Sequence, residues 1–224
     1  MRGAHGRRAL FMKYTHVIWD FNGTILDDVQ VGIDSINEML IPRDLPPIRG
    51  VEEYREVFDF PVEEYYRRLG LDLEKEDFKT VLAPLWVSYY NEKCRTAPLF
   101  PGVRALNLAI RNTGVPQSIL SASEKGMMIA QLKERGAADW FDEIWGTDSI
   151  HAYGKQELAR AWRAAHPGVR AVLIGDTTHD AETAGIVGAD CVLVAAGHQS
   201  RERLAATGAP VVSSLSECAP LILG

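Results

Sequence analysis

Side chains that could carry out chemistry follow directly on short apolar runs at several places in the sequence. They are Asp20 and Asn22 after the first run, Ser121 after the second, and Asp176 and Asp180 after the fourth. If the runs are parallel strands, their carboxyl ends share one edge of a sheet, and these side chains meet in one crevice. A single Asp after a strand is usually a turn former or a helix cap. Several such ends that carry carboxylates and a hydroxyl are better explained by a shared site.

Carboxylates that converge on one point repel each other unless a cation lies between them. Oxygen ligands without a His or Cys companion favour Mg²⁺ over zinc. Lys155, in Gly154-Lys155-Gln156, would add a positive charge near such a metal. Its position alone is more typical of a solvated lysine at the start of a helix. The sequence therefore predicts an oxygen-only Mg²⁺ site, with Lys155 as a candidate neighbour.

The elements that must position these residues alternate between strands and helices. We expect strands over Val17–Trp19, Gln117–Leu120, Phe141–Trp145, Val169–Ile174, Cys191–Val194 and Val211–Val212. Helical periodicity between them predicts helices over 103–112, 123–136, 156–165 and 181–187, and after Ser200 and Ser214. This alternation is typical of an α/β fold, a Rossmann-like doubly wound parallel sheet.

The stretch between the first two strands carries helical patterns and no convincing strand. We expect it to form an inserted helical cap over residues 27–95, with the α/β core built from residues 12–26 and 96–224. Residues 1–11 are Arg-rich and precede a cleaner beginning at Met12, so they are interpreted as a mis-called start or an extension.

Four motifs in order resemble the haloacid dehalogenase-like (HAD) hydrolases, and within them the phosphoglycolate phosphatase-like subgroup with a C1 helical cap. The segment from Asp20 to Asp27, DFNGTILD, is similar to the family's DxDGT(L/I)xD. Ser121 ends an apolar strand as in the second motif, Lys155 falls where the third-motif lysine belongs, and the segment from Gly175 to Asp180 matches GDxxxD. The resemblance spans about residues 14–194.

This resemblance implies a role for each site residue. Asp20 would be the nucleophile of a phosphatase that forms an aspartyl-phosphate. Mg²⁺ would be held by the carboxylates of Asp20 and Asp176 and the backbone carbonyl of Asn22, with Asp180 in an outer contact. Ser121, the amide of Ala122 and Lys155 would bind the phosphoryl group. In the cap, Arg49 and Arg55 are candidates for an anionic substrate tail, although a solvated face beside Glu52, Glu53 and Glu56 explains them equally well.

Asn22 departs from the family pattern, which has an Asp there in phosphatases. That Asp serves as general acid and then general base, and an amide can do neither. Losing such a group typically costs about 10²–10⁴-fold in rate. The substitution leaves open a phosphatase that is slow or whose leaving group needs little protonation. In that case the exchange Asn22→Asp should restore a proton donor.

Other readings remain beside the phosphatase. In a 2-haloacid dehalogenase Asp20 would attack carbon, but such enzymes use no metal and lack the residue equivalent to Asp176. A phosphonate hydrolase needs a cap lysine, and residues 27–74 contain none. A catalytically weak protein that binds a phosphorylated metabolite or regulates a partner also fits.

Composition limits the partners. The formal net charge is −6 and no basic stripe is present, which argues against nucleic acid. No apolar run approaches the roughly 20 residues that cross a bilayer. The three cysteines show no paired spacing, which suits a reducing compartment. We therefore expect a cytoplasmic monomer or homodimer that acts on a small phosphorylated metabolite.

Overall fold

The structure is a computed structural model, and it describes residues 13–148 and 155–224. The expectation about residues 1–11 lies outside these ranges. Six parallel strands form a single sheet in the order β3-β2-β1-β4-β5-β6. The strands are β1 (His16–Trp19), β2 (Gln117–Glu124), β3 (Glu143–Thr147), β4 (Ala171–Gly175), β5 (Asp190–Val194) and β6 (Val211–Val212). This confirms the predicted doubly wound α/β sheet.

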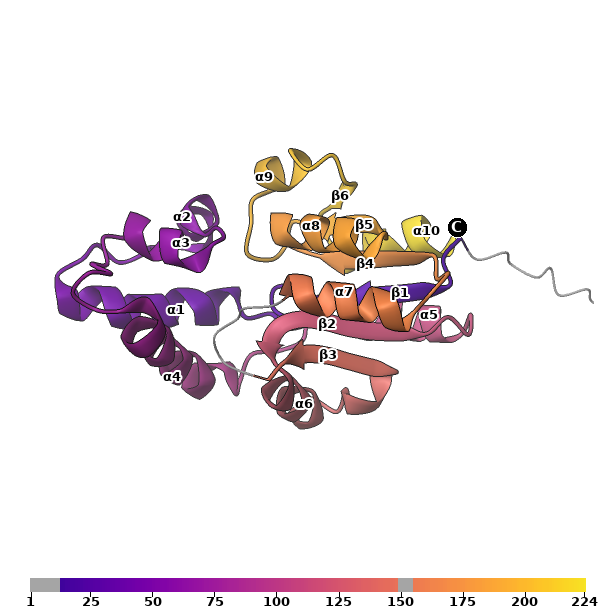
Figure 1. Cartoon of the computed structure of the whole chain (residues 1–224), viewed down its shortest axis with the longest axis horizontal. Coiled ribbons are helices and arrows are strands. Elements are labelled where there is room, and N and C mark those ends of the chain that lie inside the picture. Colours follow the sequence, from indigo (N-terminus) through magenta and orange to yellow (C-terminus); the bar gives the residue numbers. More distant parts are fainter. Residues whose placement is uncertain (1–12, 149–154) are drawn as a thin grey trace, which may run out of the picture.

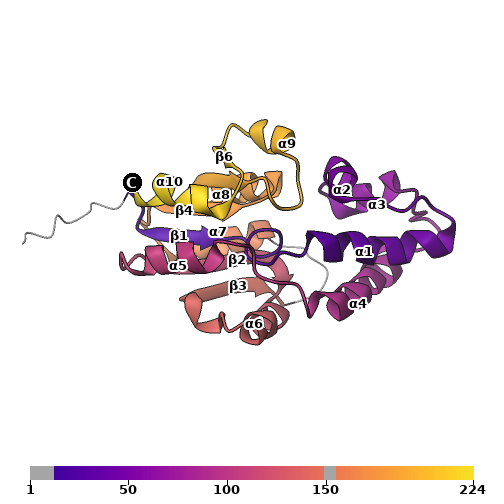
Figure 2. The same cartoon turned by 180° about the vertical axis from the view of Figure 1, so that it is seen from behind.

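Helices cover both faces of the sheet (Figures 1 and 2), which is why the central strands are almost continuously apolar. Successive residues of β1 illustrate this. Val17 and Trp19 pack with α5 (Val103–Arg111), α6 (Lys125–Glu134) and α10 (Cys218–Leu223), whereas Ile18 packs with α7 (Lys155–Ala165) and α8 (Thr178–Val187). The remaining core helices are α9 (Arg201–Ala205) and two short 3₁₀ helices at Ala138–Trp140 and Leu215–Glu217.

The chain between β1 and β2 forms a helical cap. It contains α1 (Val29–Leu40), α2 (Val51–Val57), α3 (Val62–Arg68) and α4 (Ala83–Cys94), with a 3₁₀ helix at Ile41–Arg43 and a π-helical turn at Phe78–Leu82. The cap has its own core, which includes Ile36, Met39 and Leu82. In Figure 1 these helices lie beyond one end of the sheet, opposite the end that carries the C-terminus.

Two segments that lie side by side join the cap to the core. Leu26 and Leu99 form an antiparallel bridge. The Asp27 N–H donates to the carbonyl of Pro98, and the Phe100 N–H donates to the carbonyl of Ile25, both at 2.9 Å. The chain therefore leaves the core for the cap and returns to it at nearly the same point.

Two arginines tie the cap to the loop after β5 and to α9. Arg55 of α2 donates from Nε to the Gly197 carbonyl at 2.8 Å and from Nη2 to the Ala196 carbonyl at 2.5 Å. In the opposite direction, Arg203 of α9 donates to the carbonyls of Phe58 and Glu56. The cap is thus held against the core by bonds from both sides.

The main difference from the expected elements is at the end of β2. The strand continues to Glu124, beyond the expected end at Leu120, and α6 begins after it. Glu124 caps α6 by accepting from the amides of Gly126 and Met127. Ser123, where we expected the helix to begin, uses its hydroxyl elsewhere. Across the described residues, no helix is both long and apolar enough to span a membrane.

Candidate active site

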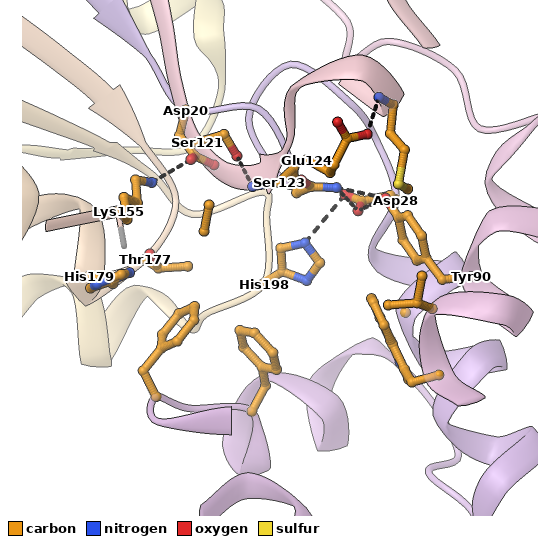
Figure 3. A pocket seen from close by; sticks show the side chains of 18 of the residues that line it. Asp20, Asp28, Tyr90, Ser121, Ser123, Glu124, Lys155, Thr177, His179 and His198 are labelled. Carbon is orange, nitrogen blue, oxygen red and sulfur yellow. Dashed lines mark hydrogen bonds and ion pairs between the residues drawn. The ribbon is translucent and has the colours of Figure 1, made fainter. Parts of the chain in front are cut away.

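The residues that the sequence singled out at the strand ends lie together at the edge of the sheet that faces the cap. Asp20 follows β1, Ser121 lies in β2, Lys155 begins α7, and Asp176 and Asp180 follow β4. Carboxylate oxygens of Asp20, Asp176 and Asp180 all lie within 4.8 Å of one another, and all three side chains are buried. Figure 3 shows Asp20, Ser121 and Lys155 at one side of the cavity between core and cap.

Lys155 links two of these carboxylates. Its Nζ donates to Oδ1 of Asp20 and to Oδ1 of Asp180, each at 2.5 Å. Burial lowers the pKa of Lys155, but the charges of Asp180 and Asp20 raise it further, so the net shift is upward and the ammonium stays charged. Lys155 is therefore a buried cation of the site and not a solvated helix residue.

Asp180 is shared between this ion pair and the start of α8. Its Oδ2 accepts from the amides of Asp176 and Thr177 and from the Thr177 hydroxyl, which forms a capping box. Burial raises the pKa of Asp180, but Lys155 and Thr177 outweigh it and lower the pKa overall. Asp180 therefore stays ionised and holds Lys155 in place.

Asp176 is fixed by two donors from distant segments. Its Oδ1 accepts from the Thr24 hydroxyl at 3.0 Å, and its Oδ2 accepts from the His198 amide at 2.7 Å. Burial raises the pKa of Asp176 to about 6, although His198 lowers it. Gly23 lies against this carboxylate with φ +72°, and a Cβ there would come within 2.2 Å of Asp176 Oδ2. Only glycine fits at that point of the turn.

The donor set fits a hard divalent cation. Burial raises the pKa of Asp20, and Asp180 and Asp176 add to the shift beyond what Lys155 offsets. Carboxylates whose charged forms are disfavoured in this way gain most from a nearby cation. The cluster offers only oxygen atoms, as Mg²⁺ requires. Asp180 accepts from four donors, whereas Asp176 accepts from two and Asp20 from Lys155, so Asp20 and Asp176 have more capacity left to bind a cation.

Asn22 is held by three partners and has no free orientation. Its Nδ2 donates to Oδ2 of Asp28 at 2.7 Å and to the Tyr90 hydroxyl at 2.6 Å, and its Oδ1 accepts from the Ser123 hydroxyl at 2.5 Å. The side chain lines the cavity. Its amide links Ser123 of the core with Asp28 and Tyr90 of the cap.

Asp28 and His198 are site residues that the sequence reasoning missed. Asp28 is buried and accepts from the Gly23 amide at 2.8 Å, from Asn22 and from the Tyr90 hydroxyl. The imidazole of His198 lies 3.3 Å from Asp28 through Nε2 and 2.9 Å from the Tyr54 hydroxyl through Nδ1. In Figure 3 His198 points into the cavity toward Asp28.

The pKa values of this pair move in opposite directions. Burial lowers the pKa of His198, but Asp28, Asp176 and Asp20 raise it to about 9. Burial raises the pKa of Asp28, but His198, Tyr90 and Asn22 lower it overall. Both groups are therefore charged at neutral pH. His198 follows Ala195-Ala196-Gly197 in the loop after β5. Asp176 was predicted from its place after a strand, and the same reasoning applied to β5 would have indicated His198.

The other predicted residues divide into two groups. Ser121 and Ala122 line the cavity beside Asp20, where they can face a phosphoryl group. Arg49 and Arg55 do not lie among the described residues that line it. Arg49 is exposed, and Arg55 donates to the carbonyls of Ala196 and Gly197. Neither guanidinium reaches into the cavity, because Arg55 is occupied in holding the cap to the core.

The cavity has a volume of about 210 Å³ and two unlike walls. The core supplies the charged cluster around Asp20. The cap supplies mainly aromatic and aliphatic groups, which are Tyr54, Phe58, Phe60, Trp86, Val87 and Tyr90. His179 of α8 also lines the cavity and packs against the ring of Phe60 at 4.8 Å. Burial and Lys155 lower its pKa, so His179 adds no positive charge.

The chain is similar to known proteins over most of its length. A model of the family described as haloacid dehalogenase-like hydrolases matches residues 17–194. The chain is 27% identical to a phosphoglycolate phosphatase of Rhodobacter capsulatus over 192 residues. The aligned region covers 82% of this chain and 85% of that protein. It is 25% identical to a tyrosine-protein kinase, PtkA, of Mycobacterium bovis, over 88% of this chain and 67% of that protein.

Solved structures show the same fold. A haloacid dehalogenase-like family hydrolase from Streptococcus pneumoniae superimposes with a TM-score of 0.78 at 21% identity, over 93% of this chain and 98% of that one. A predicted phosphatase from Clostridium acetobutylicum superimposes with a TM-score of 0.75 at 21% identity, over 94% and 98% of the two chains.

Proposed function

Because the chain belongs to the haloacid dehalogenase-like hydrolase family, we propose that it is a Mg²⁺-dependent phosphatase of a small phosphorylated metabolite. Asp20 is the proposed nucleophile, and the reaction passes through an aspartyl-phosphate. The observation that carries this proposal is the buried cluster in which Lys155 bonds Asp20 and Asp180 beside Asp176. A phosphoryl group needs positive charge and fixed donors, because catalysis of its transfer is mostly positioning and electrostatic stabilisation. Lys155 supplies one positive charge, and the three carboxylates would hold a cation that supplies the rest.

The chain's own residues divide the work as follows. Lys155 orients the Asp20 carboxylate and offsets its charge, while Ser121 and the amide of Ala122 bind phosphoryl oxygens. Asp20 attacks phosphorus, the bond to the leaving oxygen breaks, and water then attacks phosphorus of the aspartyl-phosphate to release inorganic phosphate. Asp20, Asp176 and the Asn22 backbone carbonyl would hold Mg²⁺, with Asp180 behind them, and the bound ion would supply charge stabilisation. The cap excludes bulk water from this cavity.

Asn22 sets the limit of this chemistry. Its amide neither donates a proton to a leaving oxygen nor accepts one from water, so turnover of substrates with poor leaving groups should be slow. The side-chain contacts of Asn22 do not involve Asp20 or Asp176, so we expect the binding of metal and phosphate to be retained. The proposal is therefore a phosphatase whose leaving group departs without help from the residue at position 22.

A 2-haloacid dehalogenase is the alternative that the structure supports less. Attack on carbon needs no metal, yet Asp176 is buried and is held near Asp20 by hydrogen bonds from Thr24 and His198. A buried carboxylate with a raised pKa is costly unless a cation accompanies it. This favours the metal-dependent reaction.

A screen of phosphorylated metabolites with Mg²⁺ and with chelator tests the proposal. We expect phosphate release only with Mg²⁺, its loss in Asp20→Asn, and weaker Mg²⁺ binding in Asp176→Asn by calorimetry. Chloride release from a 2-haloacid in the presence of chelator would establish the dehalogenase instead. If phosphate compounds bind in calorimetry but none is hydrolysed, the protein is a binding or regulatory one.

A further inference from the structure

The cap wall of the cavity carries two groups of aromatic rings, and the rings within each group contact one another. Trp86 and Tyr90 of α4 stack with centroids 4.7 Å apart. Phe58 contacts Phe60 at 5.5 Å and stacks on Tyr54 at 5.2 Å. Together with Val87 and Met127 they line the cavity. Such walls favour apolar and aromatic ligand groups.

Positive charge in the cavity is already matched by carboxylates of the protein. Among the described residues that line it, the charged groups are Lys155 and His198 against Asp20, Asp28 and Glu124. Lys155 is bonded to Asp20 and Asp180, and His198 lies against Asp28. The nearby guanidinium groups of Arg55 and Arg203 are bonded to backbone carbonyls. A second anionic group on the substrate would therefore be buried without a partner, which is costly.

The size of the cavity agrees with an aromatic occupant. An apolar cavity of roughly 150 Å³ is known to accommodate benzene. At about 210 Å³, this cavity has room for one ring beside the phosphoryl position. The fixed amide of Asn22 agrees independently, because a phenolate leaves without a positioned acid whereas an alkoxide does not.

We propose that the substrate is a monoester of phosphate with an uncharged aryl alcohol. This inference rests on the proposed phosphatase function and names its substrate class. The Asp20 carboxylate oxygen forms a bond to phosphorus, and the bond from phosphorus to the aryl oxygen breaks with its electron pair. The aryl oxide then takes a proton from solvent. Its ring lies against the wall formed by Phe58, Phe60 and Trp86.

A pair of substrates with matched leaving groups tests the charge requirement. The probes are 4-(carboxymethyl)phenyl phosphate and its methyl ester, which differ in charge, whereas the methylene group keeps the acidity of the two phenols nearly equal. We expect kcat/KM to be at least about 10-fold higher for the ester. A short alkyl phosphate should be slower again, and acetyl phosphate reports on the phosphatase chemistry without an aryl group.

Variants of the wall supply the matched controls. Val87→Arg adds a cation to the apolar wall. It should lower the ratio of kcat/KM for the ester to kcat/KM for the carboxylate by about 10-fold. Leu108→Arg adds the same charge at an exposed position of α5 and should leave the preference unchanged. If Val87→Arg does not fold, Trp86→Ala serves instead and should raise KM for the aryl ester by about 10-fold, against Leu108→Ala as its control.

The outcomes separate the two proposals. A preference for the neutral aryl ester that Val87→Arg reduces supports the aryl substrate. Equal or faster turnover of the carboxylate or the alkyl phosphate overturns it and leaves the phosphatase proposal standing. If acetyl phosphate and every ester remain intact with Mg²⁺ present, both proposals fail.

Discussion

At the scale of single residues, Asn22 and Asp28 form one unit. The amide donates to the carboxylate at 2.7 Å, and both contact the Tyr90 hydroxyl. A carboxylate at position 22 would therefore face the buried, ionised Asp28. Two carboxylates at that separation cannot both be ionised. They would share one proton between them, and that proton would not be available to a leaving group. The structure thus changes what we expect from the exchange Asn22→Asp.

We predict that Asn22→Asp alone gains little activity and lowers the free energy of unfolding by about 1–3 kcal/mol. The double variant Asn22→Asp/Asp28→Asn restores one amide and one carboxylate in exchanged places. Its kcat for alkyl phosphates should rise by about 10²-fold over the wild type. Steady-state kinetics and urea unfolding of all four proteins complete the cycle, with Asp28→Asn as the control. A single variant as fast as the double one would show that Asp28 does not oppose the new carboxylate.

Gly23 gives a second residue-scale prediction. A Cβ there would lie 2.2 Å from Asp176 Oδ2, so Gly23→Ala should displace that carboxylate and weaken Mg²⁺ binding by at least about 10-fold. Gly114→Ala is the control, because Gly114 has a similar φ of +79° but nothing within 4 Å of the added methyl group. Gly114→Ala should lower only the free energy of unfolding, by about 1–2 kcal/mol, because alanine is strained at this positive φ. Calorimetric titration with Mg²⁺ measures the difference, and equal affinity in both variants would contradict the close approach.

At the scale of elements, Arg55 fastens α2 to the loop after β5. Arg55→Met keeps much of the side-chain length but removes both bonds to the carbonyls of Ala196 and Gly197. Because Arg55 is half-buried, we expect the free energy of unfolding to fall by about 1–2 kcal/mol and proteolysis within the cap to become faster. Arg49→Met, at an exposed position of the same segment, is the control and should behave like the wild type. Equal proteolysis of both variants would show that other contacts hold the cap.

The elements also show which parts of the site could be predicted from sequence. Asp20, Ser121, Asp176 and Asp180 could be, because parallel strands bring their carboxyl ends to one edge whatever the side-chain packing. The contact between Asp28 and His198 could not, because it joins segments 170 positions apart and depends on how the cap rests on the core. The bonds from Arg55 to the carbonyls of Ala196 and Gly197 could not be predicted for the same reason. Periodicity likewise missed the extension of β2 to Glu124, which depends on pairing with Thr147.

At the scale of the whole molecule, His16 makes stability depend on pH. It lies buried between the sheet and α7, 2.7 Å from the Ser118 hydroxyl and 5.0 Å from the ring of Trp162. Burial and the neighbouring His166 lower its pKa from 6.5 to about 4, although Glu143 and Asp142 oppose the shift. The unfolded chain thus binds a proton over this range that the folded protein does not. The contribution of neutral His16 to the free energy of unfolding is therefore complete above pH 6.5 and is lost as the pH falls toward 4.

We predict that His16→Gln flattens this dependence. Between about pH 7 and pH 5 the wild type should lose about 2 kcal/mol more of its free energy of unfolding than the variant, at 1.36 kcal/mol per pKa unit. Urea unfolding of both proteins at each pH measures this, and the difference between them cancels the titration of the active-site carboxylates. Parallel pH profiles would show that another group is responsible.

The side-by-side segments around Leu26 and Leu99 have a consequence for how such a protein changes over evolutionary time. Because the cap begins and ends at one point, it can be lengthened, shortened or exchanged without altering the path of any strand. Asp20, the proposed nucleophile, and the carboxylates beside it belong to the core, whereas the aromatic wall proposed to contact the substrate belongs to the insertion. Selection can therefore act on the choice of substrate through one continuous stretch of the gene and leave the reaction itself untouched.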